Sequence, residues 1–303
     1  MSGRGLKLVV IGAGVMGRNH ARIASSLPGI NLLGIVDADP ARVNDLPDVL
    51  KKIFTTDLPA LLPQVDAVVI ATPTKTHHEL AQLCLAAGKH VLLEKPFTGS
   101  SAYAKGLIAQ AKEKGLVLNV GFIERYNPAF LRMLKEIKGE KIIGIDIKRF
   151  SPFPERISDT DVVFDMMLHD LDLLSSFIKD EIIDIKAKGE KIRTKMIDRS
   201  IVAITYKNGI IARIEANRVF GSKTRNITVT ADKFLIDADL LNKKIYVRDF
   251  STPTPTTIPV IAVDQLTEEL KDFALCIKGK HQSTALSAVD SISLAEEVLR
   301  LCS

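Results

Sequence analysis

The stretch Leu6-Lys-Leu-Val-Val-Ile-Gly12-Ala-Gly14-Val-Met-Gly17 decides the fold, because an apolar run leads into a glycine pattern at the start of a helical stretch. In this spacing Gly12 permits a tight turn, and Gly14 lets a phosphate approach the backbone. Gly17 lets the helix lie close to the strand. The amides and the dipole of the helix favour an anion there. The stretch therefore predicts a dinucleotide-binding turn, and a purely structural glycine turn is the alternative.

Short apolar runs alternate with helix-like stretches as far as about Gly121, which predicts a parallel sheet covered on both faces. Strands are expected at residues 6–12, 31–37, 67–71, 90–93 and 117–121, with a weaker one near Ile53. Helices are expected at residues 16–27, 40–45, 76–87 and 102–114. Residues 1–121 are therefore predicted to form a Rossmann domain, which is a doubly wound α/β fold.

The pattern changes after Gly139, where longer alternating runs appear at residues 141–150, 182–188, 199–206, 209–216, 226–230 and 244–248. Asn208-Gly209 predicts a hairpin whose two turn positions both have positive φ. Helices are expected at 127–137, 162–178, 264–277 and 283–301, and the proline-rich residues 251–259 are expected to be a loop or a sheet edge. Residues 122–303 are thus predicted to form an α+β domain with a mostly antiparallel sheet, whose closing helices return to the first domain.

Composition sets limits on partners and location. The 303 residues exceed the usual single-domain length, and 46% are hydrophobic and 25% charged, as in an average globular protein. The net charge of +5 is spread without a basic block, so we expect a small anionic ligand and no nucleic acid. We expect no signal peptide, no membrane segment and no metal. Three cysteines without CxxC spacing, Cys84, Cys276 and Cys302, suggest a reducing, cytoplasmic setting.

Two further segments follow the ends of expected strands, where parallel sheets bind their ligands. Asp37 lies twenty residues beyond Gly17, and its carboxylate favours NAD over NADP by accepting from the ribose 2′-hydroxyl and repelling a 2′-phosphate, although nearby Arg42 could soften this choice. The segment from Ala71 to Thr74 suits cofactor contacts, but an ordinary helix-initiating loop is equally compatible. His77 and His78 are also explained by exposure or capping, and a metal pair is disfavoured because adjacent residues do not share a helix face.

Glu94-Lys95-Pro96 ends the expected strand at 90–93. Pro96 fixes its own φ and presses Lys95 towards an extended backbone, so Lys95 becomes a positioned cation, with an ordinary surface lysine as the alternative. The cofactor-binding residues predicted from these segments are Gly12, Ala13, Gly14, Val15, Met16, Gly17, Asp37, Ala71, Thr72, Pro73, Thr74, His77, Glu94 and Lys95.

The expected helix at 162–178 carries a third group of polar residues. Asp165, His169 and Asp172 stand at i, i+4 and i+7 and are expected to share one face, while the other side of this largely apolar helix holds apolar residues. Burying such a stripe is costly, so a functional site is favoured over a hydrated or salt-bridged face.

Together, the glycine pattern, Glu94-Lys95-Pro96 and Asp165-x-x-x-His169 resemble the glucose–fructose oxidoreductase, inositol dehydrogenase and MocA (Gfo/Idh/MocA) family over nearly the whole chain. This resemblance implies a Rossmann domain followed by a substrate-binding domain whose open sheet forms homodimers or homotetramers. It also implies that Lys95, Asp165 and His169 are catalytic. The implied reaction is hydride transfer between NAD and a secondary alcohol of a sugar or sugar nucleotide.

A narrower resemblance points to the branch similar to UDP-N-acetylglucosamine 3-dehydrogenases, and so to 3-oxidation of a UDP-sugar. It rests on residues 121–128, 149–159, 215–217 and 223–225, and Arg218-Val219 stands where this branch suggests tryptophan. Several basic side chains could meet a diphosphate, each with a solvated surface charge as its alternative. The predicted substrate-binding residues are Lys95, Arg125, Tyr126, Asn127, Arg149, Arg156, Asp165, His169, Lys223 and Arg225.

In the expected mechanism His169 removes the hydroxyl proton, Asp165 orients the imidazole, and Lys95 stabilises the developing alkoxide or takes part in proton relay. One alternative is a dehydrogenase of the same fold that acts on an inositol, a free sugar or a biliverdin-like substrate. The other is a non-catalytic NAD-binding protein, against which the joint presence of these three residues weighs.

Overall fold

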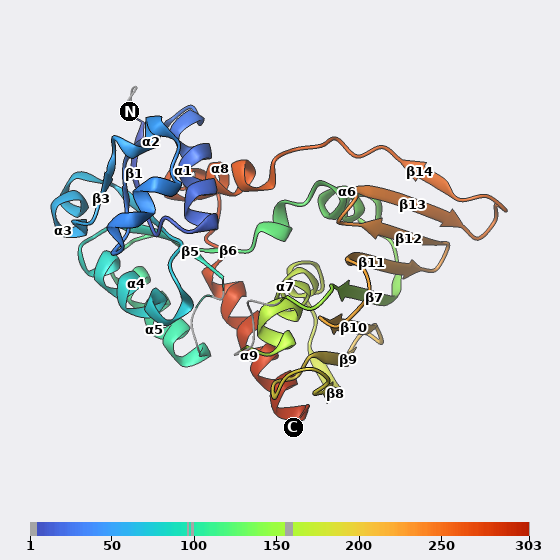
Figure 1. Ribbon diagram of the computed structural model, residues 1–303. Coiled ribbons are helices and arrows are strands. Elements are labelled where there is room, and N and C mark those ends of the chain that lie inside the picture. Colours follow the sequence, from blue (N-terminus) through green and yellow to red (C-terminus); the bar gives the residue numbers. More distant parts are fainter. Residues whose placement is uncertain (1–4, 96, 98–99, 155–159, 303) are drawn as a thin grey trace. The chain divides into compact units, whose positions relative to one another are not determined.

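The chain divides into two compact units in the computed structural model (Figure 1), which describes residues 5–302 apart from 96, 98–99 and 155–159. The first unit comprises residues 1–123 and 264–289, and the second comprises residues 124–263 and 290–303. Among the described residues no helix is long and apolar enough to span a bilayer.

The first unit is built on a six-stranded parallel sheet in the order β3-β2-β1-β4-β5-β6, which confirms the predicted doubly wound fold. The order reverses between β1 and β4, and ligands of such sheets bind at this switch point. The strands are β1 (Leu6–Ile11), β2 (Ile30–Val36), β3 (Phe54–Thr55), β4 (Ala67–Ile70), β5 (His90–Glu94) and β6 (Leu118–Gly121).

Helices and short turns join these strands. They are α1 (Val15–Ser26), η1 (Pro40–Asp45), α2 (Asp48–Lys51), α3 (Leu58–Leu61), η2 (Leu62–Gln64), η3 (Thr74–Thr76), α4 (His77–Ala86), α5 (Ser101–Glu113) and α8 (Gln265–Ile277). Leu8 and Val10 of β1 lie in a hydrophobic cluster with Leu270 and Phe273 of α8. The chain thus returns to the first unit to complete its core, and Val9, on the other face of the sheet, is fully buried as well.

The second unit contains an eight-stranded sheet in the order β14-β13-β12-β11-β7-β10-β9-β8. Among the strands that the structure describes in this sheet, only β7 and β10 pair in parallel, so the predicted mostly antiparallel sheet is confirmed. The strands are β7 (Ile142–Phe150), β8 (Ile182–Glu190), β9 (Arg199–Tyr206), β10 (Ile211–Asn217), β11 (Thr224–Ala231), β12 (Phe234–Asp239), β13 (Lys244–Asp249) and β14 (Thr256–Ile258).

Residues along these strands alternate between buried and exposed positions, so one face of the sheet contributes to the core. The helical elements of this unit are η4 (Ile123–Tyr126), which starts one residue before it, α6 (Pro128–Glu136), η5 (Val163–Met167) and α7 (Leu168–Phe177). α9 (Ala285–Leu301) begins in the first unit and ends in the second.

Three local features differ from the sequence predictions. In the hairpin between β9 and β10 only Gly209 has positive φ, because Gly209 N–H bonds to Tyr206 O and the loop combines a type I turn with one left-handed residue. β12 was missed because its sequence contains Asp237 and Asp239, a residue type that is rare in strands. The proline-rich segment contributes β14, an edge strand paired with β13.

Candidate cofactor and catalytic sites

The glycine turn after β1 has little space for side chains. A Cβ on Gly17 would lie 1.7 Å from the carbonyl oxygen of Gly12, and a Cβ on Gly12 would lie 2.5 Å from that of Ala71. Gly12 also has a φ of 101°, which L-residues rarely adopt. By contrast, an added Cβ on Gly14 would meet nothing within 4 Å. Backbone at Gly14 can therefore be approached closely by a ligand, whereas Gly12 and Gly17 keep the turn tight.

The N-terminus of α1 meets the requirements of a pyrophosphate. Its N-cap is Gly14, which provides no side-chain cap, and the first turn contains no acidic residue. Backbone N–H groups at this end remain available to an anion, and the helix dipole favours negative charge there. The residues present therefore fit a dinucleotide at the switch point of the sheet.

Asp37 follows β2, and its two carboxylate oxygens have different partners. Oδ2 accepts from the backbone N–H of Ala13 at 2.7 Å, and Oδ1 accepts from that of Asp39 at 3.0 Å. The carboxylate thus lies against the glycine turn, the place from which an acidic residue reaches an adenosine ribose in this fold.

The loop after β4 is ordered by the histidine that follows it. His77 is 1% exposed, and its Nε2 lies 2.8 Å from the carbonyl oxygen of Thr72. The Thr72 hydroxyl accepts from Thr76 Oγ1 at 2.8 Å. His78 stacks on Tyr103 with ring centroids 4.5 Å apart. This geometry favours a supporting role for His77, which keeps the residues 71–74 beside the glycine turn.

Lys95 directly follows β5 and is partly exposed. Its backbone N–H donates to Oε2 of Glu94 at 3.2 Å, and Oε1 of Glu94 lies 2.7 Å from Nε2 of His20. Glu94 is 8% exposed and His20 is fully buried. The sequence prediction grouped Glu94 with the cofactor-binding residues, but it did not single out His20. On α1, the buried residues Gly17, His20, Ala21 and Ala24 recur at helical spacing on one face. This pattern is the signal that identifies His20 as a residue facing the interior.

In the second unit, Asp165 lies in the π-helical turn η5 and His169 in the first turn of α7, and both are partly exposed. The turn is fixed by backbone bonds from Val162 N–H to Ile197 O and from Asp165 N–H to Asp161 O. Single π turns within helices are rare and occur frequently at functional sites. The structure therefore places the predicted acid in an irregular turn and the imidazole in the first turn of the helix that follows it.

Asp172 does not share their environment. It is 1% exposed, and its two oxygens accept from Nη2 and Nε of Arg125 at 2.5 and 2.6 Å. Ser291 Oγ donates to the same carboxylate at 3.1 Å. Burial raises the pKa of Asp172, while Arg125 opposes this shift. The predicted stripe of three polar residues thus separates into two partly exposed groups and one buried ion pair.

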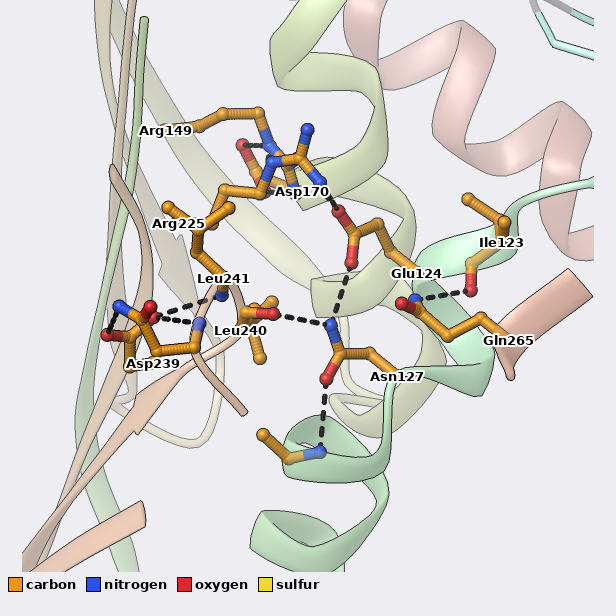
Figure 2. Close-up of polar contacts among 12 residues, drawn as sticks. Ile123, Glu124, Asn127, Arg149, Asp170, Arg225, Asp239, Leu240, Leu241 and Gln265 are labelled. Carbon is orange, nitrogen blue, oxygen red and sulfur yellow. Dashed lines mark hydrogen bonds and ion pairs between the residues drawn. The ribbon is translucent and has the colours of Figure 1, made fainter. Parts of the chain in front are cut away.

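Arg149 is 4% exposed and lies between two carboxylates (Figure 2). Its Nη2 is 2.7 Å from Asp170 Oδ1, and its Nη1 is 3.0 Å from Glu124 Oε1. Burial alone would raise the pKa of Glu124, but Arg149 and Arg225 outweigh burial and hold that pKa below its usual range. These bonds favour a structural role for Arg149, because each of its three guanidinium nitrogens donates to a carboxylate within the protein.

The remaining predicted substrate residues differ in exposure. Asn127 is buried, caps α6 through a bond to Ala129 N–H, and donates to Glu124 and to the carbonyl of Leu240 (Figure 2). Arg225 also pairs with Glu124, at 2.9 Å, but 46% of its side chain is exposed. Lys223 is exposed, Tyr126 is partly buried, and Arg156 lies outside the described residues.

Arg218, at a position where the resemblance suggested tryptophan, is fully buried. Its Nε donates to Asp198 Oδ1 at 2.9 Å, its Nη1 donates to the carbonyl of Thr160, and its Nη2 donates to Thr194 Oγ1 at 3.3 Å. The guanidinium also lies 5.9 Å from the centre of the Phe153 ring. A buried ion pair therefore occupies this part of the core.

Two family models match the chain. Residues 6–122 match the oxidoreductase family with an NAD-binding Rossmann fold, and residues 149–236 match the GFO/IDH/MocA C-terminal domain. The first match lies in the first unit and the second match lies in the second unit.

Individual relatives match most of the chain. A UDP-N-acetylglucosamine 3-dehydrogenase from Acidithiobacillus ferrooxidans is 34% identical over 272 residues, which are 87% of this chain and 86% of that protein. A scyllo-inositol 2-dehydrogenase (NAD(+)) from Bacillus subtilis is 24% identical over 90% of this chain and 86% of its own length. The solved structure of UDP-N-acetylglucosamine 3-dehydrogenase GnnA from A. ferrooxidans superimposes with a TM-score of 0.90 at 30% identity, covering 98% of this chain and 97% of that chain.

Proposed function

From the premise that the chain belongs to the Gfo/Idh/MocA oxidoreductase family, we propose that it oxidises the 3-hydroxyl of UDP-N-acetylglucosamine or a closely related UDP-sugar. The chain is an NAD-binding oxidoreductase, as its sequence predicted. The observation that carries the UDP-sugar assignment is the 34% identity, over 87% of this chain, to an enzyme of that specificity. The TM-score of 0.90 to the solved structure supports the same assignment.

The glycine turn, the amides of α1 and Asp37 would hold NAD, which when bound supplies the acceptor for a hydride. Gly14 would let the pyrophosphate approach the backbone, because nothing lies within 4 Å of its side-chain position. Asp37 already bonds to the Ala13 N–H of the glycine turn. The ribose-binding carboxylate and the phosphate-binding turn thus form one preformed unit.

We propose Lys95, Asp165 and His169 as the catalytic residues. His169 takes the hydroxyl proton, since imidazole is the side chain that most often acts as a general base. Asp165 orients the imidazole and stabilises its protonated form. Lys95 stabilises the negative charge that develops on the substrate oxygen, a contribution of the kind typically worth about 10²–10³ in turnover.

For the diphosphate we propose Lys223 and Arg225, because both have exposed side-chain surface. We keep Tyr126 as a proposed substrate-binding residue without assigning it to the diphosphate. We assign Arg125 and Arg149 a structural role instead, since each is bonded to a buried carboxylate of the second unit. A planar guanidinium such as that of Arg225 suits phosphate oxygens, and its ion pair with Glu124 would hold it in a defined orientation.

We also propose a cytoplasmic homodimer or homotetramer that associates through the open face of the second unit's sheet. The free thiols of Cys84, Cys276 and Cys302 support a reducing compartment. Burial raises the pKa of Cys84 to about 12, so this thiol is inert.

The substrate assignment is tested by following NADH absorbance with NAD and a panel of UDP-N-acetylglucosamine, free N-acetylglucosamine, myo-inositol and scyllo-inositol. We expect kcat/KM for the UDP-sugar to exceed that for the free sugar by about 10²-fold or more, because binding energy from the nucleotide part contributes to the transition state. A reaction without sugar is the control. A higher kcat/KM for an inositol would reassign the substrate, and NAD binding without turnover of any compound would contradict catalysis.

A further inference from the structure

A buried cluster in the first unit lies beside the segment that carries Lys95. It consists of His20 of α1, Glu94 of β5 and Glu269 of α8, which are 0%, 8% and 1% exposed. One side-chain nitrogen or oxygen from each residue lies within 4.8 Å of the other two. Burying three ionisable groups together is costly, so such a cluster indicates a specific role.

Each oxygen of Glu94 has a different partner in this cluster. Oε1 lies 2.7 Å from His20 Nε2, and Oε2 accepts the backbone N–H of Lys95 at 3.2 Å. The carboxylate of Glu94 packs closely against β6, because a Cβ on Gly121 would lie 3.2 Å from Glu94 Oε2. His20 Nδ1 has no hydrogen-bond partner among the described residues, so Glu94 is the contact that fixes the imidazole in that part of the chain.

We propose that His20 is a positioning residue for Lys95, which it orients through Glu94. With its proton on Nε2, the imidazole donates to Oε1 and fixes the rotamer of Glu94. Oε2 then holds the backbone N–H of the residue that leaves β5. This inference rests on the proposed function, in which Lys95 stabilises charge on the substrate oxygen.

The place of His20 in the chain makes α1 serve two purposes. Its N-terminus, at Gly14, faces the predicted pyrophosphate position, and His20 lies in its second turn. The helix that binds the cofactor phosphate therefore also bears the hydrogen bond that orients the lysine. Loss of that hydrogen bond should affect turnover and leave the phosphate contacts of the turn intact.

A direct hydrogen bond describes this cluster better than a shared metal ion. Ligand atoms about 2.0–2.2 Å from a tetrahedral ion lie about 3.3–3.6 Å from one another. The separation of 2.7 Å between His20 Nε2 and Glu94 Oε1 is instead that of a charge-assisted hydrogen bond. The metal content of the purified protein distinguishes a hydrogen bond from a shared metal ion, so it is a second readout of the experiment.

The test compares His20→Leu, which removes the donor, with His20→Gln, whose amide can replace Nε2. We expect kcat to fall about 10- to 100-fold in His20→Leu, as is typical of small misplacements of a catalytic group. Affinity for NAD should change less than about threefold, and His20→Gln should recover most of the turnover. Ile23→Ala truncates a buried residue of the same helix without touching Glu94, and it controls for loss of stability. If His20→Leu does not fold, His20→Asn replaces it, because its shorter amide does not reach Glu94.

Combining these variants with Lys95→Ala decides whether His20 acts through the lysine. Lys95→Ala should lower kcat about 10²–10³-fold. Adding His20→Leu should then change kcat less than about twofold, because the group it positions is gone. If His20→Leu lowered kcat in the Lys95→Ala background as much as it does in the wild type, the positioning role alone would be overturned. A stoichiometric metal ion that is present in the wild type and lost in His20→Gln would overturn the same role. Full turnover by Lys95→Ala would instead overturn both this role and the catalytic role of Lys95.

Discussion

At the scale of single residues, Asp37 has two functions that depend on the same carboxylate. Its oxygens accept from the backbone N–H groups of Ala13 and Asp39, so it holds the glycine turn in place. We infer that its negative charge also favours NAD over NADP, because a 2′-phosphate would have to approach it. The hydrogen bond to Ala13 N–H does not require that charge, since an amide oxygen can accept as well.

Asp37→Asn should therefore raise the use of NADP relative to NAD. One unit charge about 4 Å away contributes about 1 kcal/mol in water and more near a protein surface, which predicts a change of about tenfold or more. The ratio of kcat/KM for the two cofactors measures the effect. Asp48→Asn, an exposed carboxylate paired with Lys51, is the matched control. An unchanged ratio in Asp37→Asn would show that another residue selects the cofactor.

At the scale of elements, the pair Asp198–Arg218 ties the loop before β9 to the end of β10. Asp198 Oδ2 accepts from the backbone N–H groups of residues 192, 193 and 194, and Arg218 bonds to the carbonyl of Thr160. Val162, which precedes the π turn, is bonded to Ile197 in the same loop. The pair thus supports the turn that carries Asp165, although neither residue belongs to the proposed chemistry.

Asp198→Asn should destabilise the protein by about 3–5 kcal/mol near neutral pH, because it leaves the buried Arg218 uncompensated. Burial opposes ionisation of Asp198, but its backbone N–H and hydroxyl donors outweigh burial and hold its pKa well below the usual range. A lowered native pKa gives stability that is full above the unfolded pKa of about 3.9 and is lost as pH falls through the native value.

Thermal unfolding of wild type and Asp198→Asn between pH 2 and 8 measures this linkage. The difference in melting temperature should be constant above about pH 5 and shrink below about pH 4. Asp184→Asn removes an exposed partner of Lys186 and should leave the melting temperature nearly unchanged. A difference that does not depend on pH would contradict the assigned ionisation.

At the scale of the whole molecule, the sheet of the second unit presents one large open face. Most of its strands have six to nine residues and rise about 3.3 Å per residue, with neighbours about 4.8 Å apart. The face therefore covers about 800 Å², which is what one partner contributes to a standard protein interface. Ile211 is 54% exposed and Tyr246 is 38% exposed at positions facing outward. The area of this face suits association of two copies, and Ile211 and Tyr246 are exposed apolar residues on it.

The double variant Ile211→Lys/Tyr246→Lys should shift the protein to a smaller oligomer, because like charges from both copies would meet across a two-fold interface. Size-exclusion chromatography with light scattering measures the mass in solution. Val49→Lys places the same charge at a residue of the first unit that is 71% exposed, and it is the control. An unchanged mass in the double variant would place the interface elsewhere.

Much of the fold could be predicted because its signals are local. The buried strands of the first unit read as continuous apolar runs, and β1, β4 and β5 appeared within one residue of the expected bounds. β12 could not be recognised, because Asp237 is stabilised by bonds from Asn226 and Thr228 on the neighbouring strand. The Asn208-Gly209 pair correctly predicted a hairpin but not its turn type, because Asn208 does not have positive φ.

Sequence alone was enough to predict the glycine turn, the acidic residue after β2, the lysine after β5 and the acid–imidazole pair on the helix of the second unit. Each was recognised from spacing along the chain or from its position after an apolar strand, and both can be read from the sequence. Only the tertiary structure showed that Arg125 and Arg149 hold buried carboxylates, and that His20 reaches the lysine segment through Glu94. Whether a charge binds a ligand or a buried partner depends on which distant residues surround it, and that environment is created only when the chain folds.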